Sequence, residues 1–299
     1  MEEVINGILI REVETKNIMT KSSLPVGGYS VNPYVGCTHA CKYCYASFMK
    51  RFTGHTEEWG TFLDVKHWPE IKNPKKYAGQ RVVIGSVTDG YNPQEEQFGN
   101  TRKLLEQLIG SDADILICTK SDLVVRDIDL LKKLGRVTVS CGRVTVSWSI
   151  NTLDENFKND MDSASSIEHR IAAMKQVYEA GIRTVCFVSP VFPGITDFEA
   201  IFERVKDQCD LFWLENLNLR GGFKKTIMDY IAGKYPDLVP LYDEIYNKHN
   251  RSYFEALEVK AEKMAKKYDC AFVDNEMPYG RVPQGHPVIV DYFYHEEIR

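Results

Sequence analysis

The sequence predicts an α/β fold, a partial (β/α)6 TIM-like barrel with a mostly helical C-terminal extension. Three observations predict it. Short β-branched runs alternate with helical patterns, helix-breaking signals separate each pair, and polar motifs follow several runs at their carboxyl ends. Strands that alternate with helices form βαβ units, so the alternation predicts a parallel sheet or barrel.

The predicted strands begin just before a cysteine-rich loop, at residues 29–34. Further short apolar runs follow at intervals that leave room for a helix between them. These runs are residues 81–87, 115–118, 144–150, 184–188 and 211–214. Together they make about six βα units, the number expected for a partial barrel.

Helical patterns fill the intervals between the strands. One pattern covers 104–109 and stops at Gly110, and another covers 123–134 and stops at Gly135. The next two helices are expected to begin at capping boxes, which pair a Ser or Thr with a Glu three residues later. The two boxes are Ser165 with Glu168 and Thr196 with Glu199.

The C-terminal part has a different pattern. Residues 224–268 are largely helical in pattern, and the end from Cys270 has an irregular one. We therefore expect a barrel core with an N-terminal lead-in over residues 1–223. A helical extension and a tail packed on the barrel are expected over residues 224–299.

Residues 135–148 hold a tandem repeat, GRVTVSC followed by GRVTVSW. An insert of odd length inside a strand would turn every later side chain to the other face. We therefore expect the second copy to be the true strand, and the first copy to extend it or to fold back as a hairpin. A duplication explains the repeat without a functional role.

The composition is that of an ordinary globular protein, with 43% hydrophobic residues and 26% charged residues. No apolar run approaches the roughly 18 residues that a membrane span needs, so no membrane association and a cytoplasmic location are expected. The net charge of −5 argues against nonspecific coating of nucleic acid. A local basic groove remains compatible with that charge.

The loop GCTHACKYCYA carries Cys37, Cys41 and Cys44 in the spacing C-x3-C-x2-C. A structural zinc site usually needs two separated pairs of ligands, and every later cysteine stands alone. His39 would be a poorly placed fourth ligand. A cubane iron–sulfur cluster suits three cysteines better, because they hold three irons and leave the fourth open for chemistry. A zinc-stabilised binding module and an electron-transfer iron–sulfur protein remain the alternatives.

The loop resembles the signature of the radical S-adenosylmethionine (radical SAM) superfamily, including the aromatic Tyr43 before the last cysteine. Further stretches resemble the branch of spore photoproduct lyase and DNA repair photolyase-like proteins. They are SVTDGYNPQE at 86–95, TKS at 119–121 and RDIDLL at 126–131. The stretches at 21–25 and 47–55 are closest to the radical SAM mobile pair protein B group.

This resemblance implies a 4Fe–4S cluster on Cys37, Cys41 and Cys44 that cleaves SAM reductively to methionine and a 5′-deoxyadenosyl radical. The radical then abstracts hydrogen from a substrate that the sequence does not identify. An electron donor such as flavodoxin or ferredoxin is implied, with a second radical SAM protein as a further partner. Nucleic acid is the substrate that the branch implies as an alternative.

The resemblance also implies contacts to SAM at the ends of successive strands, where barrel active sites assemble. The implied cofactor-binding residues are Ser86, Thr88, Asp89, Lys120, Ser149 and Asn151. Lys120 would meet the SAM carboxylate in a charge-assisted hydrogen bond. Ser86 stands where spore photoproduct lyase has a hydrogen-donor cysteine. A serine O–H bond is too strong for that role, so the resemblance does not extend to repair of spore photoproduct.

Overall fold

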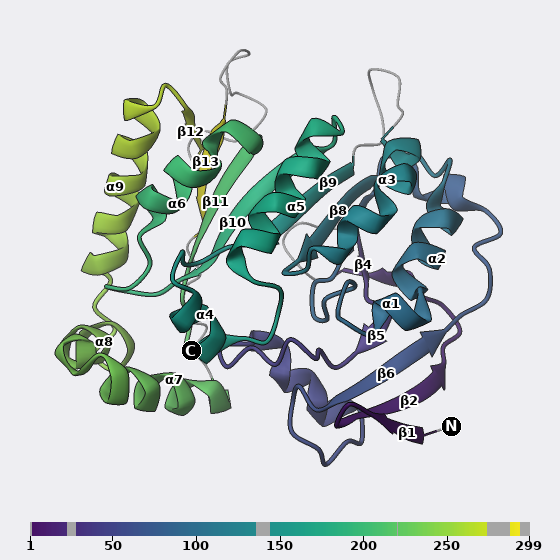
Figure 1. The fold of residues 1–299 in the computed structure, drawn as a ribbon, viewed down its shortest axis with the longest axis horizontal. Helices are drawn as coiled ribbons and strands as arrows, with labels where there is room; N and C mark the ends of the chain where they lie inside the picture. Colours follow the sequence, from purple (N-terminus) through teal and green to yellow (C-terminus); the bar gives the residue numbers. More distant parts are fainter. Residues whose placement is uncertain (1, 23–27, 136–143, 220, 274–287, 294–299) are drawn as a thin grey trace. The chain divides into compact units, whose positions relative to one another are not determined.

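Strands and helices alternate along much of the chain in the computed structural model, which describes residues 2–22, 28–135, 144–219, 221–273 and 288–293 (Figure 1). The contact pattern divides the chain into two units. The first contains residues 1–148 and 162–184, and the second contains residues 149–161 and 185–299. Among the described residues, no helix is both long and apolar enough to cross a membrane.

The main sheet strands of the first unit lie in the order β9-β8-β7-β4-β3. The pairings β4–β7, β7–β8 and β8–β9 are parallel, and β3–β4 is antiparallel. This confirms the parallel sheet predicted from the strand–helix alternation. The strands are β3 (Thr20–Lys21), β4 (Tyr29–Val31), β7 (Arg81–Ile84), β8 (Asp114–Thr119) and β9 (Val144–Ser149).

A second, smaller sheet of the first unit has the order β1-β2-β6-β5. The prediction of one continuous strand at 29–34 is wrong, because the chain leaves the main sheet after Val31. Tyr34 then pairs antiparallel with Val65 in the smaller sheet. Tyr34 is fully buried there, with Leu63 and Val65. The strands are β1 (Glu2–Ile5), β2 (Ile8–Glu14), β5 (Tyr34–Val35) and β6 (Phe62–His67).

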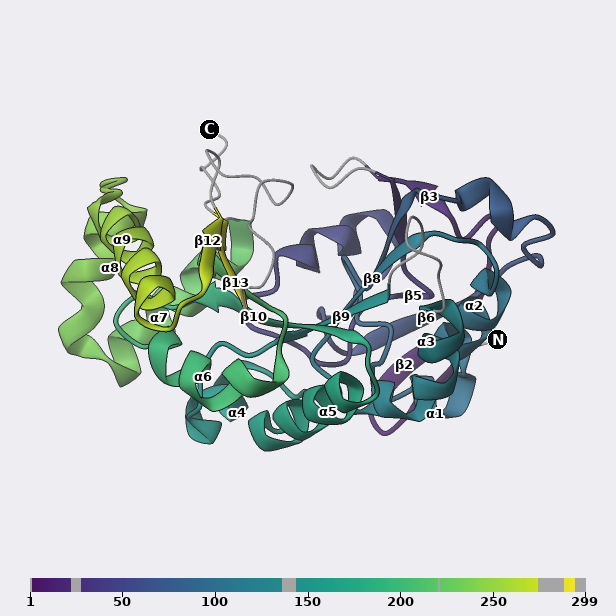
Figure 2. The same cartoon turned by 90° about the horizontal axis from the view of Figure 1, so that it is seen from above.

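Helices α2, α3 and α5 lie on one side of the main strands of this unit (Figure 2). Buried Leu104, Leu105 and Leu108 of α2 pack inward, as their periodicity predicts. The helices are α1 (Glu95–Phe98), α2 (Asn100–Leu108), α3 (Ile128–Leu134) and α5 (Ile167–Glu179), with short 3-10 helices η1 (Tyr45–Phe52), η2 (Pro74–Tyr77) and η3 (Leu123–Asp127).

Both predicted capping boxes are displaced by one residue. Ser166, not Ser165, caps α5 by accepting from the amide of His169. Asp197, not Thr196, caps α6 (Phe198–Val205) in the same way, with Ala200 as the donor. The hydroxyl of Thr196 instead donates to the carbonyl of Asn151, since a tertiary partner is available there.

The strands of the second unit lie in the order β12-β13-β11-β10, and their pairings are all parallel. In the described part of the end from Cys270, the expectation of an irregular structure is wrong, because β12 and β13 join this sheet. Leu211–Glu215 of β11 pairs with Ile289–Phe293 of β13. The strands are β10 (Arg183–Val191), β11 (Leu211–Asn216), β12 (Ala271–Val273) and β13 (Ile289–Phe293).

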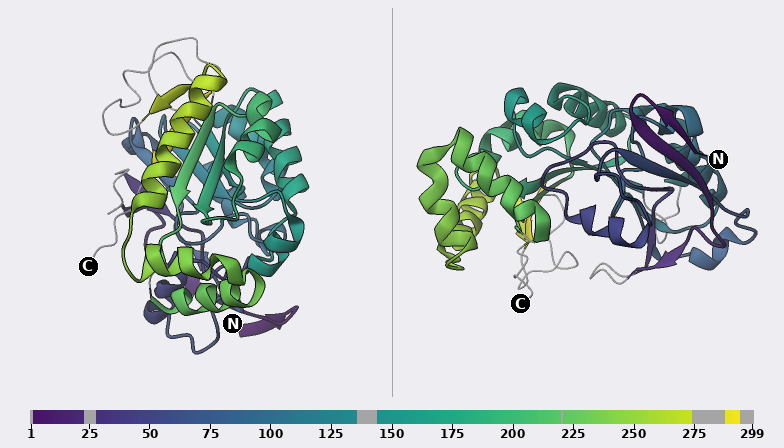
Figure 3. Two further views of the ribbon diagram at one scale, coloured as in Figure 1. Left: turned by 90° about the vertical axis from the view of Figure 1, so that its left-hand side faces the viewer. Right: turned by 90° about the horizontal axis from the view of Figure 1, so that it is seen from below.

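The helices of the second unit confirm the helical pattern of residues 224–268. Helix α9 packs against β12 and β13, and α7 packs against α8 (Figure 3). Phe202 of α6 contacts Phe212 of β11 edge to face, with ring centroids 5.1 Å apart. The helices are α4 (Glu155–Met161), α6, η4 (Lys206–Gln208), α7 (Gly221–Lys234), η5 (Pro236–Leu238), α8 (Val239–Tyr246) and α9 (Ser252–Lys267).

The second copy of the tandem repeat forms β9, as expected, and Val146 and Trp148 are fully buried in it. The expectation for the first copy falls on residues 136–141, which lie outside the described part of the chain.

Candidate functional site

The cysteine loop connects β5 to η1. Two tight turns shape it, since the amide of Ala40 donates to the carbonyl of Cys37 and the amide of Cys44 donates to that of Cys41, each at 3.1 Å. Gly36 starts the loop with φ +85°, a conformation that side chains rarely adopt. The local turns therefore gather three thiols within eight residues, ahead of a short helix.

The three thiols lie in surroundings that disfavour a free thiolate. Burial raises the pKa of each of them, that of Cys37 to about 12. The nearby Asp89 carboxylate raises the pKa of Cys37 further, while amide hydrogen bonds from Asp89 and His39 lower it. Positive charge on Lys120 offsets part of the rise in the pKa of Cys41, which stays above its ordinary value. A bound metal supplies the stronger positive charge that deprotonates coordinating thiols.

The donor set of this loop fits a cubane cluster. Such a cluster takes cysteine sulfurs, and each cysteine binds a different iron, so its ligands need not converge on one point. Among the described residues, no three His, Cys, Asp or Glu side chains are arranged to hold a single metal ion. One buried nitrogen of the loop, Nδ1 of His39, lacks a hydrogen-bond partner within the described structure.

The turn after β7 holds Ser86, Thr88 and Asp89 beside this loop. Asn32, which follows β4, organises the turn by accepting from the amides of Val87 and Thr88 at 3.1 and 3.3 Å. Its side-chain amide also donates to the hydroxyl of Ser86 at 3.3 Å. Thr88 is buried. The predicted strand-end turn is thus held by a side chain from the neighbouring strand.

Asp89 is buried, and its carboxylate lies 2.9 Å from Nε2 of His39. It also accepts from the hydroxyl of Thr119 and the amides of Lys120 and Tyr91. Burial alone would raise the pKa of Asp89, but the charge and hydrogen bonds of these partners lower it below its ordinary value. The carboxylate therefore joins the cysteine loop to the end of β8.

Lys120 follows β8 and reaches the cysteine loop. Its ammonium lies 5.6 Å from the centroid of the Tyr43 ring. The hydroxyl of Tyr43 donates to Asp162 at 3.1 Å, and Asp162 pairs with buried Arg170 of α5 at 2.7 Å. The structure thus brings together the three cysteines, the turn after β7 and Lys120, as the sequence predicts for this unit.

Ser149 and Asn151 belong to the second unit. Ser149 is half-buried at the end of β9, and Asn151 is buried just beyond it. The side-chain nitrogen of Asn151 has no hydrogen-bond partner among the described residues. Their expected contact with SAM stays a prediction.

Two residues of the site, Asn32 and Asp162, were not predicted from the sequence. The pairing of His39 with a carboxylate was not predicted either. Asn32 and Asp162 belong to no motif, and each meets the site only through the fold. His39 stands inside the cysteine motif, where a buried imidazole needs a polar partner. That need was the one available signal, and it did not identify Asp89 as the partner.

Helix η1 carries an exposed aromatic strip, defined as Tyr45, Phe48 and Phe52. These side chains are 57%, 46% and 67% exposed. The guanidinium of Arg51 lies 5.3 Å from the Phe48 ring centroid and 4.6 Å from that of Phe52. The Tyr45 hydroxyl donates to the carbonyl of Ser86, so the strip begins at the edge of the motif residues.

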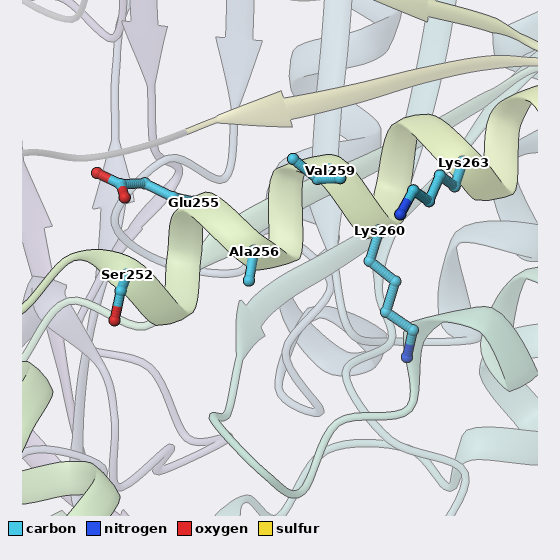
Figure 4. Close-up of a pocket in the computed structure, with 6 residues that line it drawn as sticks. All are labelled: Ser252, Glu255, Ala256, Val259, Lys260 and Lys263. Carbon is cyan, nitrogen blue, oxygen red and sulfur yellow. The ribbon is translucent and has the colours of Figure 1, made fainter.

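A depression on the surface of α9 lies apart from these motifs in the sequence (Figure 4). Its lining comes from one helix and includes none of the predicted site residues. The lining residues are Ser252, Glu255, Ala256, Val259, Lys260 and Lys263.

Comparisons with known proteins agree with the fold and the motifs. The sequence matches the family described as the Radical SAM superfamily over residues 31–205. It is 35% identical to the uncharacterised protein MJ0683 of Methanocaldococcus jannaschii, over 81% of this chain and 88% of that protein. It is 27% identical to a radical SAM Nalpha-GlyT isomerase of Pseudomonas phage M6, over 60% of this chain and 36% of that protein.

The fold is similar to that of spore photoproduct lyase complexed with dinucleoside spore photoproduct. The TM-score is 0.55 with 17% sequence identity, over 76% of this chain and 66% of the lyase chain. The chain thus spans just under two thirds of the length of this solved structure. The likeness supports a partial TIM-like barrel.

Proposed function

The chain belongs to the radical SAM superfamily, whose members use a 4Fe–4S cluster and SAM, and we propose that Cys37, Cys41 and Cys44 hold that cluster. When bound there and reduced, such a cluster would supply the electron for cleavage of SAM to methionine and a 5′-deoxyadenosyl radical. One observation carries the proposal: the cysteine loop, the turn after β7 and Lys120 meet in one place although they are far apart in the sequence.

Residues around the loop would bind and orient SAM. Lys120 would pair with its carboxylate, a role supported by the position of the ammonium near Tyr43 and Cys41. Ser86 and Thr88 would lie beside its amino group or ribose. Ser149 and Asn151 would contact SAM as the family resemblance implies, and the unpartnered side-chain nitrogen of Asn151 supports a ligand there.

The test is anaerobic reconstitution of the protein with iron and sulfide, followed by reduction in the presence of SAM. The proposal expects about four irons and four sulfides per chain, and formation of 5′-deoxyadenosine measured by mass spectrometry. Cys41→Ala should lose both. Cys270→Ala, which removes a buried thiol outside the loop, is the matched control and should keep both.

Full iron loading without formation of 5′-deoxyadenosine would contradict a radical enzyme and would favour an electron-transfer iron–sulfur protein. Zinc bound at one ion per chain, with no sulfide, would favour the zinc-stabilised binding module.

For the substrate, the aromatic strip favours nucleic acid as a second, narrower proposal. Exposed aromatic rings stack on unpaired bases of any sequence, and a neighbouring guanidinium strengthens such contacts. Arg51 lies against Phe48 and Phe52 in this way. The dinucleoside in the spore photoproduct lyase complex is consistent with this class of substrate. Repair of spore photoproduct itself is not proposed, because Ser86 lacks the thiol that would return hydrogen.

Binding of a short single-stranded DNA by the reconstituted protein tests this substrate class. Phe48→Ala with Phe52→Ala should weaken binding by about 10-fold, the effect expected when a base loses its stacking partner. Val259→Ala, which truncates an exposed apolar residue on α9, is the control and should leave binding unchanged. Equal affinity of the double variant and the control would rule out the strip as a nucleic-acid platform.

The cluster needs an electron donor, and we propose a flavodoxin or ferredoxin in the cytoplasm. A second radical SAM protein is a further proposed partner. Both partners rest on family resemblance. Reduction of the reconstituted cluster by a purified flavodoxin system, followed spectroscopically, tests the first. Co-purification with a co-expressed second radical SAM protein tests the second partner. If the two proteins do not co-purify, that partner is rejected.

A further inference from the structure

Asp89 has its acceptor positions filled by protein groups. An ionised carboxylate offers about four acceptor sites on its two oxygens. Oδ1 accepts from the Tyr91 amide and the Thr119 hydroxyl, both at 2.9 Å. Oδ2 lies 2.9 Å from Nε2 of His39 and accepts from the Lys120 amide at 2.7 Å. With 8% of the residue exposed, little of Asp89 is left for the amino group of SAM.

The partners of Asp89 come from three segments of the chain. His39 lies between two of the proposed cluster ligands. Tyr91 belongs to the turn of Asp89 itself, Thr119 ends β8, and Lys120 follows it. The Thr119 hydroxyl in turn accepts from the amide of Ser121 at 3.0 Å, so it is fixed from both sides. Asp89 therefore sets the spacing between the cysteine loop and the end of β8.

The spacing between the cysteine loop and the end of β8 affects SAM binding, because the side chain of Lys120 extends from the segment that ends β8. Its ammonium lies over the ring of Tyr43, a residue of the cysteine loop. A cluster iron would hold one end of the SAM methionine group from the loop side, and Lys120 would hold its carboxylate from the β8 side. Both attachments depend on how far apart the loop and the strand end are held.

We propose that Asp89 is a positioning residue, which governs SAM binding through His39 and Lys120 without touching SAM. The inference rests on the proposed function of this site and replaces the direct SAM contact implied for Asp89 by resemblance. Residues that orient direct ligands commonly change affinity or activity when they are replaced, even though they make no contact themselves.

The experiment measures SAM affinity and iron content in the reconstituted protein, with Asp89→Asn and Lys120→Met singly and together. Asn keeps the size of Asp but presents an NH2 group to one pair of the donors. The expected result is about 10-fold weaker SAM binding in Asp89→Asn at unchanged iron content. In the Lys120→Met background, Asp89→Asn should weaken SAM binding by less than about threefold, because the route through Lys120 is already lost and only the route through His39 is left.

Asp129→Asn is the matched control. It makes the same chemical change at a half-exposed carboxylate that pairs with Arg102, and SAM affinity should stay within about twofold of the original protein. If Asp89→Asn does not fold, Thr119→Val removes one contact of Asp89 and leaves the carboxylate in place. It should weaken SAM binding by about threefold, and only when Lys120 is present.

Two results would overturn the inference. The first is an equal loss of SAM affinity on Asp89→Asn in the presence and in the absence of Lys120. The second is a SAM affinity that neither Asp89→Asn nor Thr119→Val changes. The first would mean that Asp89 does not act on SAM binding through Lys120. Failure of the proposed function is separate, since it would show as absence of SAM binding and cleavage in the unaltered protein.

Discussion

At the scale of single residues, Gly36 determines how the cysteine loop leaves β5. A Cβ at this position would lie 2.4 Å from the carbonyl oxygen of Phe62, and φ is +85°. Gly36→Ala therefore adds a backbone clash to an unfavourable conformation. We expect a loss of about 3 kcal/mol in the free energy of unfolding and a sharp fall in iron content after reconstitution.

Gly54→Ala provides the control for this prediction. Gly54 has φ +75°, but a Cβ there would meet nothing within 4 Å. The substitution should cost about 1 kcal/mol from backbone strain alone and should keep the iron. Equal losses in the two variants, measured by denaturant unfolding and iron analysis, would contradict a special role for the clash at Gly36.

Arg170 and Asp162 form a buried ion pair that supports the loop from α5. Their side chains are 0% and 1% exposed. Arg170→Met would leave the Asp162 carboxylate buried beside Tyr43 without its counter-charge, at an expected cost of about 3–5 kcal/mol in denaturant unfolding. Lys175→Met, at a 61% exposed position of the same helix, should change stability by less than about 0.5 kcal/mol. A cost below that of the control would show that the pair contributes nothing.

At the scale of elements, two neighbouring serines at the start of α5 have different roles: one caps the helix, and the other makes a tertiary contact. The Ser166 hydroxyl accepts from the His169 amide, whereas the Ser165 hydroxyl donates to Asp122 at 2.6 Å. Ser166→Ala should lower the protection of the His169 amide against hydrogen exchange by about 1 kcal/mol. Ser165→Ala should leave that amide unchanged. The reverse pattern would restore Ser165 as the cap.

The division of residues 29–35 between two sheets also depends on how the elements pair. Both halves have strand character, but β4 pairs parallel with β7 and β5 pairs antiparallel with β6. Alternating local pattern does not specify a partner strand. The break between them brings Asn32 beside Ser86, so the change of sheet also shapes the candidate site.

At the scale of the whole molecule, SAM binding and folding should be linked. A ligand that binds only the folded state stabilises it, by about 2.7 kcal/mol at 100 times its dissociation constant. Thermal unfolding of the reconstituted protein should therefore shift upward as SAM is added. Lys120→Met should reduce the shift at the same SAM concentration, while Lys175→Met should not. An unchanged midpoint at saturating SAM would contradict the linkage.

Much of the fold and the chemistry was predictable because it depends on local signals. Cysteine spacing, turn-forming residues and strand–helix periodicity act over a few neighbouring residues, and they indicated the parallel strands and the cysteine loop. The ends of the elements were less predictable. Ser165 and Thr196 are sound caps by pattern, but each has a stronger partner elsewhere in the fold.

The class of this protein follows from the order of residues in the chain, because three closely spaced thiols and the motifs after successive strands are properties of that order. Which polar groups contact one another depends on the folded arrangement. The His39–Asp89 contact spans 50 residues, and the Tyr43–Asp162 contact spans 119. Such pairings are selected by burial, where each polar group needs a partner, and burial exists only once the strands have assembled.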